Sequence, residues 1–144
     1  MRSDKLGTFS LDQAITATAA STDVVDLGAT GTPKPGHTTA LTRDIGKGTP
    51  IPIRIQVTET FATLTSLTVA IQVDDNSGFS SATTVLATQA IPLASLVAGY
   101  VFNIEFIPRN TNERYVRLYY TVAGSNATAG KVTAFIVEAG QSNP

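Results

Sequence analysis

Residues 91–124 read IPLASLVAGYVFNIEFIPRNTNERYVRLYYTVAG, and this stretch decides the fold class. It contains two runs in which large apolar residues recur at every second position. These are Tyr100, Phe102, Ile104 and Phe106 in the first run and Val116, Leu118, Tyr120 and Val122 in the second. Successive side chains of an extended chain point to opposite faces, so the period of two predicts two half-buried strands. The polar segment Arg109–Arg114 between them is typical of a loop, and we expect the two strands to form an antiparallel pair.

The same period predicts strands elsewhere in the chain. They are expected at Gln13–Ser21, Asp23–Leu27, Ile51–Glu59, Ser66–Val73, Thr83–Ile91 and Gly130–Ala139. The first alternates small side chains, and the fifth has the weakest pattern. The last has apolar residues on both faces, which predicts a strand buried on both sides or one at a subunit contact. Leu93–Gly99 is expected to form one helical turn closed by its glycine. The sequence therefore predicts a single all-β domain over residues 1–144, with about eight strands in a sandwich or barrel.

Two segments do not fit the strand pattern. Met1–Asp12 is polar with isolated apolar residues and is expected to be an N-terminal arm. Gly28–Pro52 holds four of the seven prolines and five of the eleven glycines. Because proline lacks a backbone donor, this region is not expected to supply central strands. Long ordered loops are usually functional or interfacial, so we expect an excursion that contacts a partner; a flexible insertion without a role is the alternative.

The composition argues against several classes of protein. Only 15% of the residues are charged, against about 25% in a typical soluble domain, and a surface with little charge is easily covered by another protein. The net charge of −1 and the pI of about 5.7 give no bulk attraction to nucleic acid. The absence of cysteine excludes disulfides and thiolate metal sites. No apolar run approaches the roughly 18 residues of a membrane span, and the N-terminus does not read as a signal peptide, so synthesis in the cytoplasm is expected.

Candidates for catalysis are few. His37, the only histidine, lies in the excursion, and no Gly-x-Ser-x-Gly motif accompanies it, so an exposed loop histidine is the better interpretation. Glu59, Glu105 and Glu138 lie at or within predicted strands. Glu105 alternates with the aromatic face of its strand and is expected to point to solvent or to a partner, although a catalytic pair with Glu59 stays open.

Asp74–Gly78 reads DDNSG and resembles the start of a calcium loop. Aligned from Asp74, its glycine falls one position early, and Val85 stands where the closing carboxylate belongs. Aspartate, asparagine and glycine are also common in turns between strands, so a turn is the preferred interpretation.

Arginines and tyrosines are interleaved around residues 109–120. The set consists of Arg109, Arg114, Arg117, Tyr115, Tyr119 and Tyr120. Such a pattern can bind single-stranded nucleic acid, but arginine and tyrosine are also enriched at protein interfaces. Since the chain is slightly acidic and lacks a wider basic stripe, a protein interface is favoured.

Five longer segments carry a family resemblance. They are QAITATAASTDVVDLGATGTPK (13–34), RDIGKGTPIPIRIQV (43–57), SLTVAIQVDDNSGFSS (66–81), IPLASLVAGY (91–100) and PRNTNERYVRLYYTV (108–122). In these segments the chain resembles the small capsid cement, or decoration, proteins of tailed bacteriophages, in particular the Bordetella-phage cement protein family.

This resemblance implies a jelly-roll-like antiparallel β-sandwich on the exterior of the phage capsid. Such a protein would staple neighbouring major capsid protein subunits of the tailed-phage shell fold, and would self-associate, most simply as a homodimer. It would have no catalytic residue, metal, cofactor, nucleic acid or membrane partner. The arm and the excursion are the expected contact surfaces. The candidate polar contacts are Arg43, Asp44, Lys47, Arg109 and Arg114.

Two other classes of function remain open at this point. The first is a carbohydrate- or receptor-binding β-sandwich module of a phage particle, although the chain has no tryptophan to form a sugar platform. The second is a small hydrolase that uses His37 or Glu105.

Overall fold

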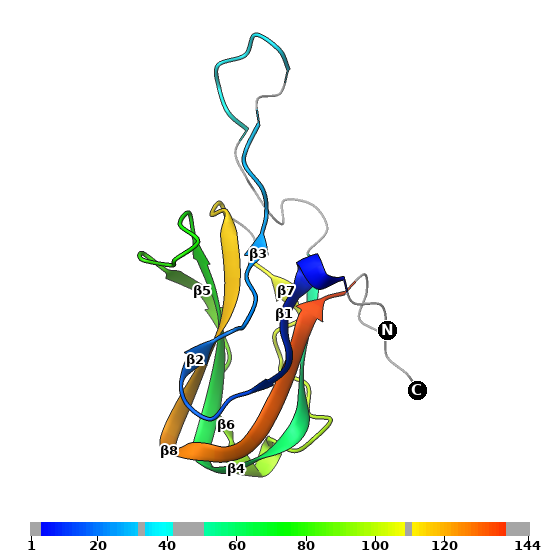
Figure 1. Cartoon of the computed structure of the whole chain (residues 1–144), viewed down its shortest axis with the longest axis vertical. Coiled ribbons are helices and arrows are strands. Elements are labelled where there is room, and N and C mark those ends of the chain that lie inside the picture. The colour runs from blue at the N-terminus through cyan, green and yellow to red at the C-terminus, as the bar shows by residue number, and fades with distance from the viewer. Residues whose placement is uncertain (1–3, 32–33, 42–50, 109–110, 138–144) are drawn as a thin grey trace.

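The computed structural model describes residues 4–31, 34–41, 51–108 and 111–137. The predicted all-β sandwich of about eight antiparallel strands is confirmed (Figure 1). The strands are β1 Thr8–Ala14, β2 Ala19–Ala20, β3 Val25–Asp26, β4 Ile51–Asp74, β5 Thr83–Ala87, β6 Ile91–Pro92, β7 Phe106–Ile107 and β8 Tyr115–Ile136. Two short 3₁₀ turns, η1 Lys5–Gly7 and η2 Leu93–Ser95, are also present. No helix in this described part of the chain is long and apolar enough to cross a membrane.

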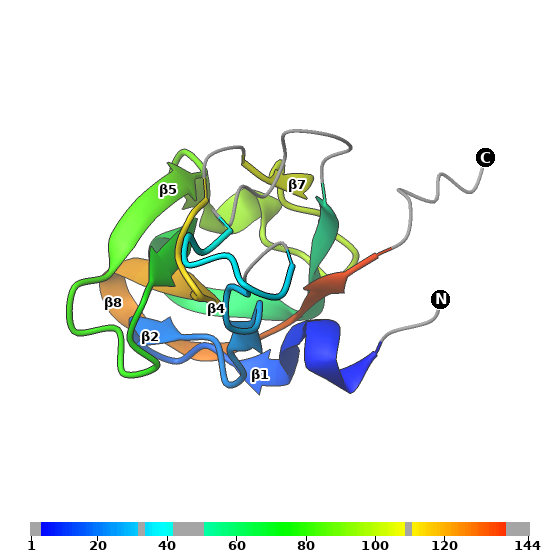
Figure 2. The same cartoon turned by 90° about the horizontal axis from the view of Figure 1, so that it is seen from above.

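Two long strands organise the fold. β4 and β8 pair antiparallel from Ile53 opposite Ile136 to Asp74 opposite Tyr115. β1 flanks the C-terminal half of β8, while β2 and β3 flank its N-terminal half. In the same way β7 flanks the N-terminal half of β4, and β5 and β6 flank its C-terminal half. Figure 2 shows the strands curled around a common centre, where the core lies.

Both long strands turn a corner near their middle. The β4–β8 register shifts repeatedly between Val57 and Ser66, and Thr63 has a positive φ of 73°. The sequence predicts separate strands at 51–59 and 66–73, and this is wrong. The intervening residues 60–65, TFATLT, are mostly β-branched or aromatic and favour extended backbone, so the strand continues through the corner.

The same correction applies to β8. The predicted strands Val116–Val122 and Gly130–Ala139 are the two ends of one strand, which ends at Ile136; residues 138–139 lie outside the described part of the chain. The predicted burial of the first run is confirmed for Val116, Leu118 and Tyr120, which are fully buried, whereas Val122 at its end is only partly buried. Burial on both faces of the second end is also confirmed, because neighbouring Ala134 and Phe135 are both buried.

The segment before β7 differs from the prediction. Its backbone bonds to β4 and not to β8: the Val57 N–H donates to the Tyr100 carbonyl, and the Phe102 N–H donates to the Ile55 carbonyl. The predicted antiparallel pair across residues 109–114 is therefore wrong, because β4 lies between its two members. Phe102 and Ile104 are buried as predicted, whereas the Phe106 side chain is 44% exposed.

The N-terminal arm is shorter than predicted. Thr8–Ala14 forms β1, and the Phe9 side chain is fully buried, so residues 8–12 belong to the sandwich. Gln13–Ser21 is not one strand, because β1 ends at Ala14 and only Ala19–Ala20 pairs again. Asp12 has a positive φ of 45° beside a register shift, which marks a β-bulge, and Gln13 and Ala14 then pair with β8 again.

Four other local predictions are settled by the backbone. The weak strand Thr83–Ile91 is divided between β5 and β6, and Asp23–Leu27 contains the short strand β3. The predicted helical turn is confirmed as η2, which ends at Ser95. Gly99 has a φ of 95° but belongs to the next turn, in which the Tyr100 N–H donates to the Val97 carbonyl. The excursion ends before Ile51, because Ile51 and Pro52 already pair with β7.

A buried chain of polar groups fastens β1 to β8. The Ser10 hydroxyl lies 2.7 Å from Gln13 Oε1 and 2.8 Å from the Tyr120 hydroxyl. Because Gln13 Oε1 can only accept, Ser10 donates to it and Tyr120 donates to Ser10. Gln13 Nε2 in turn donates to the Ala20 carbonyl. Burial raises the pKa of the Tyr120 phenol above its ordinary value.

We predict that Tyr120→Phe makes the protein less sensitive to alkali. Since the folded-state pKa of Tyr120 is raised, its contribution to stability is complete below about pH 10 and declines as the pH rises above that value. At neutral pH, the lost hydrogen bond should cost about 1 kcal/mol of unfolding free energy. Urea unfolding at several pH values checks this, with the wild type losing more stability than Tyr120→Phe above pH 10. Parallel curves for the two proteins would contradict the prediction.

Candidate interaction surface

The excursion projects from one end of the sandwich. Figure 1 shows its described residues, 28–31 and 34–41, standing clear of the strands. Every side chain from residue 34 to residue 41 is exposed, including that of His37, as predicted. The Leu41 N–H donates to the Gly31 carbonyl at 2.8 Å, so the two described parts of the excursion are joined at the start of its outer loop. This arrangement leaves the side chains of residues 34–41 exposed beyond the end of the strands.

The base of the excursion is held by an ion pair. Arg114 donates from Nε to Asp26 Oδ1 at 2.8 Å and from Nη2 to Oδ2 at 2.7 Å. The hydrogen bond with Asp26 raises the pKa of the Arg114 guanidinium, which also lies 5.0 Å from the centroid of the Tyr115 ring. The Leu27 N–H donates to the Arg114 carbonyl. Arg114, a predicted partner contact, therefore positions the last residues before the excursion.

The other predicted polar contacts fall outside the described residues. Arg43, Asp44 and Lys47 belong to 42–50, and Arg109 belongs to 109–110. They remain sequence-based predictions.

The N-terminal segment offers an apolar surface. The Leu6 and Leu11 side chains are 82% and 71% exposed, which is unusual for leucine. An open cavity of about 280 Å³ lies beside them. It is lined by Lys5, Thr8, Leu11, Asp23 and Phe135. The predicted contact role of this segment thus rests on its first turn and on the exposed edge of β1.

A cluster of rings and an arginine covers the outer face of β4 and β8. The Arg117 guanidinium carbon lies 4.2 Å from the centroid of the Phe79 ring and 5.5 Å from that of Tyr119. Arg117 Nε donates to Gln72 Oε1 at 2.9 Å. Phe79 is buried although it lies outside the central core cluster. The arginine–tyrosine pattern indicated this face from the sequence, but nothing in the pattern indicated Phe79, which comes from a turn some forty residues away.

The turn that supplies Phe79 is built on Asp74. Its carboxylate accepts hydrogen bonds from the backbone N–H groups of Asn76 at 2.9 Å and Ser81 at 2.7 Å. The bond from Asn76, with those from Ser81, lowers the pKa of Asp74 against the opposing effect of burial. Both carboxylate oxygens thus serve the turn, which supports the turn interpretation of Asp74–Gly78.

The sequence matches the Bbp16 family over residues 9–136. The chain belongs to the Bbp16 family. Bbp16 is a family of Bordetella phage proteins, which confirms the resemblance found in the sequence. No curated protein matches the chain.

The candidate catalytic carboxylates of this Bbp16 family member have different surroundings. Glu59 pairs with Lys131, with 2.6 Å between Oε2 and Nζ, and the hydrogen bond from Lys131 lowers the pKa of Glu59. A general acid needs a raised pKa, so the shift has the wrong direction for that role. Glu105 is exposed, as predicted. Among the described residues, no group of three or more acidic or histidine side chains is arranged to hold a metal ion.

We predict that calcium leaves the stability of this Bbp16 protein unchanged. The Asp74 carboxylate is already occupied by two backbone N–H groups and the Ser81 hydroxyl, and Val85 stands where a calcium loop has its closing carboxylate, so too few oxygen ligands are available. The unfolding temperature should be the same in millimolar calcium and in a chelator, whereas Asp74→Asn should lower it in both. A saturable stabilisation by calcium that disappears in Asp74→Asn would contradict the prediction.

Proposed function

We propose that this Bbp16 family member is a non-enzymatic capsid cement protein. It binds the outer surface of a phage head and staples neighbouring major capsid protein subunits. The observation that carries the proposal is the excursion, whose described residues 28–31 and 34–41 project from a sheet scaffold and whose base is tied to it by Arg114 and Asp26. A clamp needs a stiff body and a protruding contact segment, and it needs no reactive group.

The character of the surface supports the proposal. Little charge must be desolvated when the described part of the excursion is covered, because Lys34 is the only charged side chain there. Leu6 and Leu11 add apolar area on the N-terminal segment. Together these segments could bury about 1,000 Å² against a neighbour, which is at the lower limit of a specific interface.

Bivalency explains how modest contacts suffice. A homodimer that holds two shell subunits makes its second contact at high effective concentration, so overall affinity exceeds that of either contact. The proposed oligomer is therefore a dimer, and sedimentation equilibrium of the purified protein tests it. If the protein stays monomeric at micromolar concentration, each molecule would bind a single site on the shell, and the proposal that it staples neighbouring subunits would be wrong.

Co-sedimentation with undecorated, expanded phage shells tests the binding itself. The wild type should pellet with the shells at physiological salt. The double variant Lys34→Ala/His37→Ala, which alters the exposed turn of the excursion, should bind at least about tenfold more weakly, as expected for truncation at the centre of an interface.

The control variant changes a residue at the end of the molecule opposite to the excursion. Asn126→Ala lies in the corner of β8, which Figure 1 places at the end opposite to the excursion. Its exposed side chain should be dispensable for binding. Failure of the wild type to pellet with the shells would remove the proposed function. Equal losses in the two variants would remove the assignment of the contact to the excursion.

A further inference from the structure

The Arg117 guanidinium is held in place before any partner arrives. It contacts the rings of Phe79 and Tyr119, and its Nε is engaged by Gln72. An arginine fixed by rings and by one hydrogen bond loses less side-chain freedom when its remaining N–H groups bind. The side chain is half-buried, so the charge is partly desolvated already.

The Phe79 backbone has a strained conformation, and the Phe79 ring lies over the Arg117 guanidinium. Phe79 has a φ of 52°, in the left-handed region that residues with a side chain rarely adopt. Its N–H donates to the Asn76 carbonyl, and the hydrogen bonds to Asp74 fix the turn around it. Such strain persists only where the surroundings impose it, and it is typical of functional sites.

The charge of Arg117 has no partner among the described residues. Arg114 pairs with Asp26 and Lys131 pairs with Glu59, but no described carboxylate forms an ion pair with Arg117. Its two terminal nitrogens, Nη1 and Nη2, make no hydrogen bond within this part of the chain. Four N–H donors in one plane are thus left for an external acceptor.

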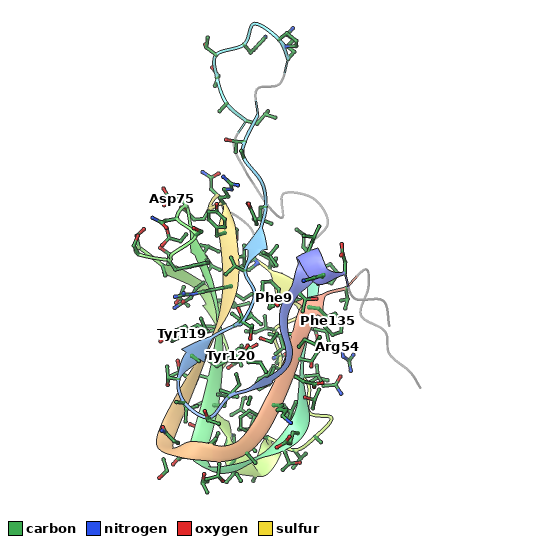
Figure 3. All side chains as sticks on the ribbon, in the orientation of Figure 1. Phe9, Arg54, Asp75, Tyr119, Tyr120 and Phe135 are labelled. Atoms are coloured by element: carbon green, nitrogen blue, oxygen red, sulfur yellow. The ribbon has the colours of Figure 1, made fainter. Side chains whose placement is uncertain are left out.

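We propose that Arg117 receives a carboxylate side chain, aspartate or glutamate, of the shell protein. A carboxylate is planar and accepts two parallel hydrogen bonds from a guanidinium, which is the strongest pairing available to this group. The proposal rests on the proposed function and adds to it the chemistry of one contact. The site also lies at the expected end of the molecule. Figure 3 places Asp75, of the turn that carries Phe79, at the same end of the sandwich as the excursion.

A protein carboxylate is favoured over a nucleic-acid phosphate. Binding along a phosphate backbone needs several unpaired cations in a row. Two of the described cations, Arg114 and Lys131, are already neutralised by carboxylates, and the net charge of the chain is −1. One receptive arginine suits a single acidic side chain.

Shell binding by Arg117 variants tests the inference. Arg117→Gln removes the charge and should weaken binding about 10- to 100-fold, the effect of losing one charge-assisted bidentate pair. Arg117→Lys keeps the charge but lacks the planar fork, and should recover less than half of the lost binding on a logarithmic scale.

Arg54→Gln is the matched control. Arg54 also donates its Nε to a glutamine, Gln56, at 3.2 Å, is half-buried, and has no ring contact among the described residues. Figure 3 shows it on the side of the sandwich away from Tyr119. Arg54→Gln should bind like the wild type, and the unfolding temperatures of all variants should agree within a few degrees.

The outcomes separate the two proposals. If the wild type does not bind shells, the proposed function fails and the inference falls with it. If the wild type binds and Arg117→Gln binds equally well, the inference is overturned while the proposed function stands. Equal losses in Arg54→Gln and Arg117→Gln would indicate bulk charge and would also overturn it. Binding of a single-stranded oligonucleotide that depends on Arg117 would assign the site to phosphate instead.

Discussion

Gly130→Ala is expected to lower the free energy of unfolding by roughly 3–5 kcal/mol. A Cβ at this position would lie 2.2 Å from Phe61 Cδ1 and 2.4 Å from Phe61 Cγ. Phe61 lies at the corner of β4 and is only 4% exposed, so its ring is enclosed by the core. The φ of 134° at Gly130 adds strain for any residue with a side chain. A loss of this size is a large part of the 5–15 kcal/mol that stabilises a typical domain.

Gly99→Ala separates the cost of steric overlap from the cost of the backbone conformation. Gly99 also has a positive φ, of 95°, but nothing lies within 4 Å of an added Cβ. It should therefore lose only about 1 kcal/mol, the cost of the backbone conformation. Urea unfolding of both variants measures the difference. Similar losses in the two variants would show that the corner relaxes easily around Phe61, contrary to the close packing observed there.

The sequence predicted the parts of the fold that depend on local alternation. Leu118 and Tyr120 were assigned to the buried face of a strand, and both are fully buried. Phe102 and Ile104 were also placed in the core correctly, although their segment pairs with a different strand from the one expected. Alternation reports which way a side chain points, and it carries no information about which neighbour lies alongside.

The errors in dividing the chain into strands share one physical origin, which is the length of β4 and β8. The chain at 60–65 was expected to separate two strands, but its β-branched residues keep it extended through the corner. Only the tertiary contact of Phe61 with Gly130 shows why a glycine is needed there. Phe9 was missed for another reason: a single buried aromatic residue in a polar segment gives no periodic signal.

The candidate surface could be predicted only in outline. The proline and glycine content of residues 28–52 indicated an excursion, and its described part does project from the sandwich. Arg114 was selected as a contact because it is a loop arginine, whereas its bond to Asp26 arises from pairing between β3 and β8. Phe79 joins Arg117 across the sheet, and no spacing in the sequence could reveal that contact.

Ile104→Asp is expected to prevent stable folding. Ile104 is only 2% exposed and belongs to the central core, next to the segment that bonds to β4. The substitution removes a buried aliphatic side chain, worth about 2–3 kcal/mol, and leaves an unpaired carboxylate whose burial costs several kcal/mol more.

The neighbouring exposed residue provides the control for that experiment. Asn103→Asp introduces the same side chain one position away, where it points to solvent, and it should unfold at nearly the wild-type urea concentration. Together the costs at Ile104 approach the whole stability of a domain of this size, so Ile104→Asp should be insoluble or show no cooperative transition. A soluble Ile104→Asp protein that unfolds cooperatively close to Asn103→Asp would mean that the segment before β7 does not pack on the core as described.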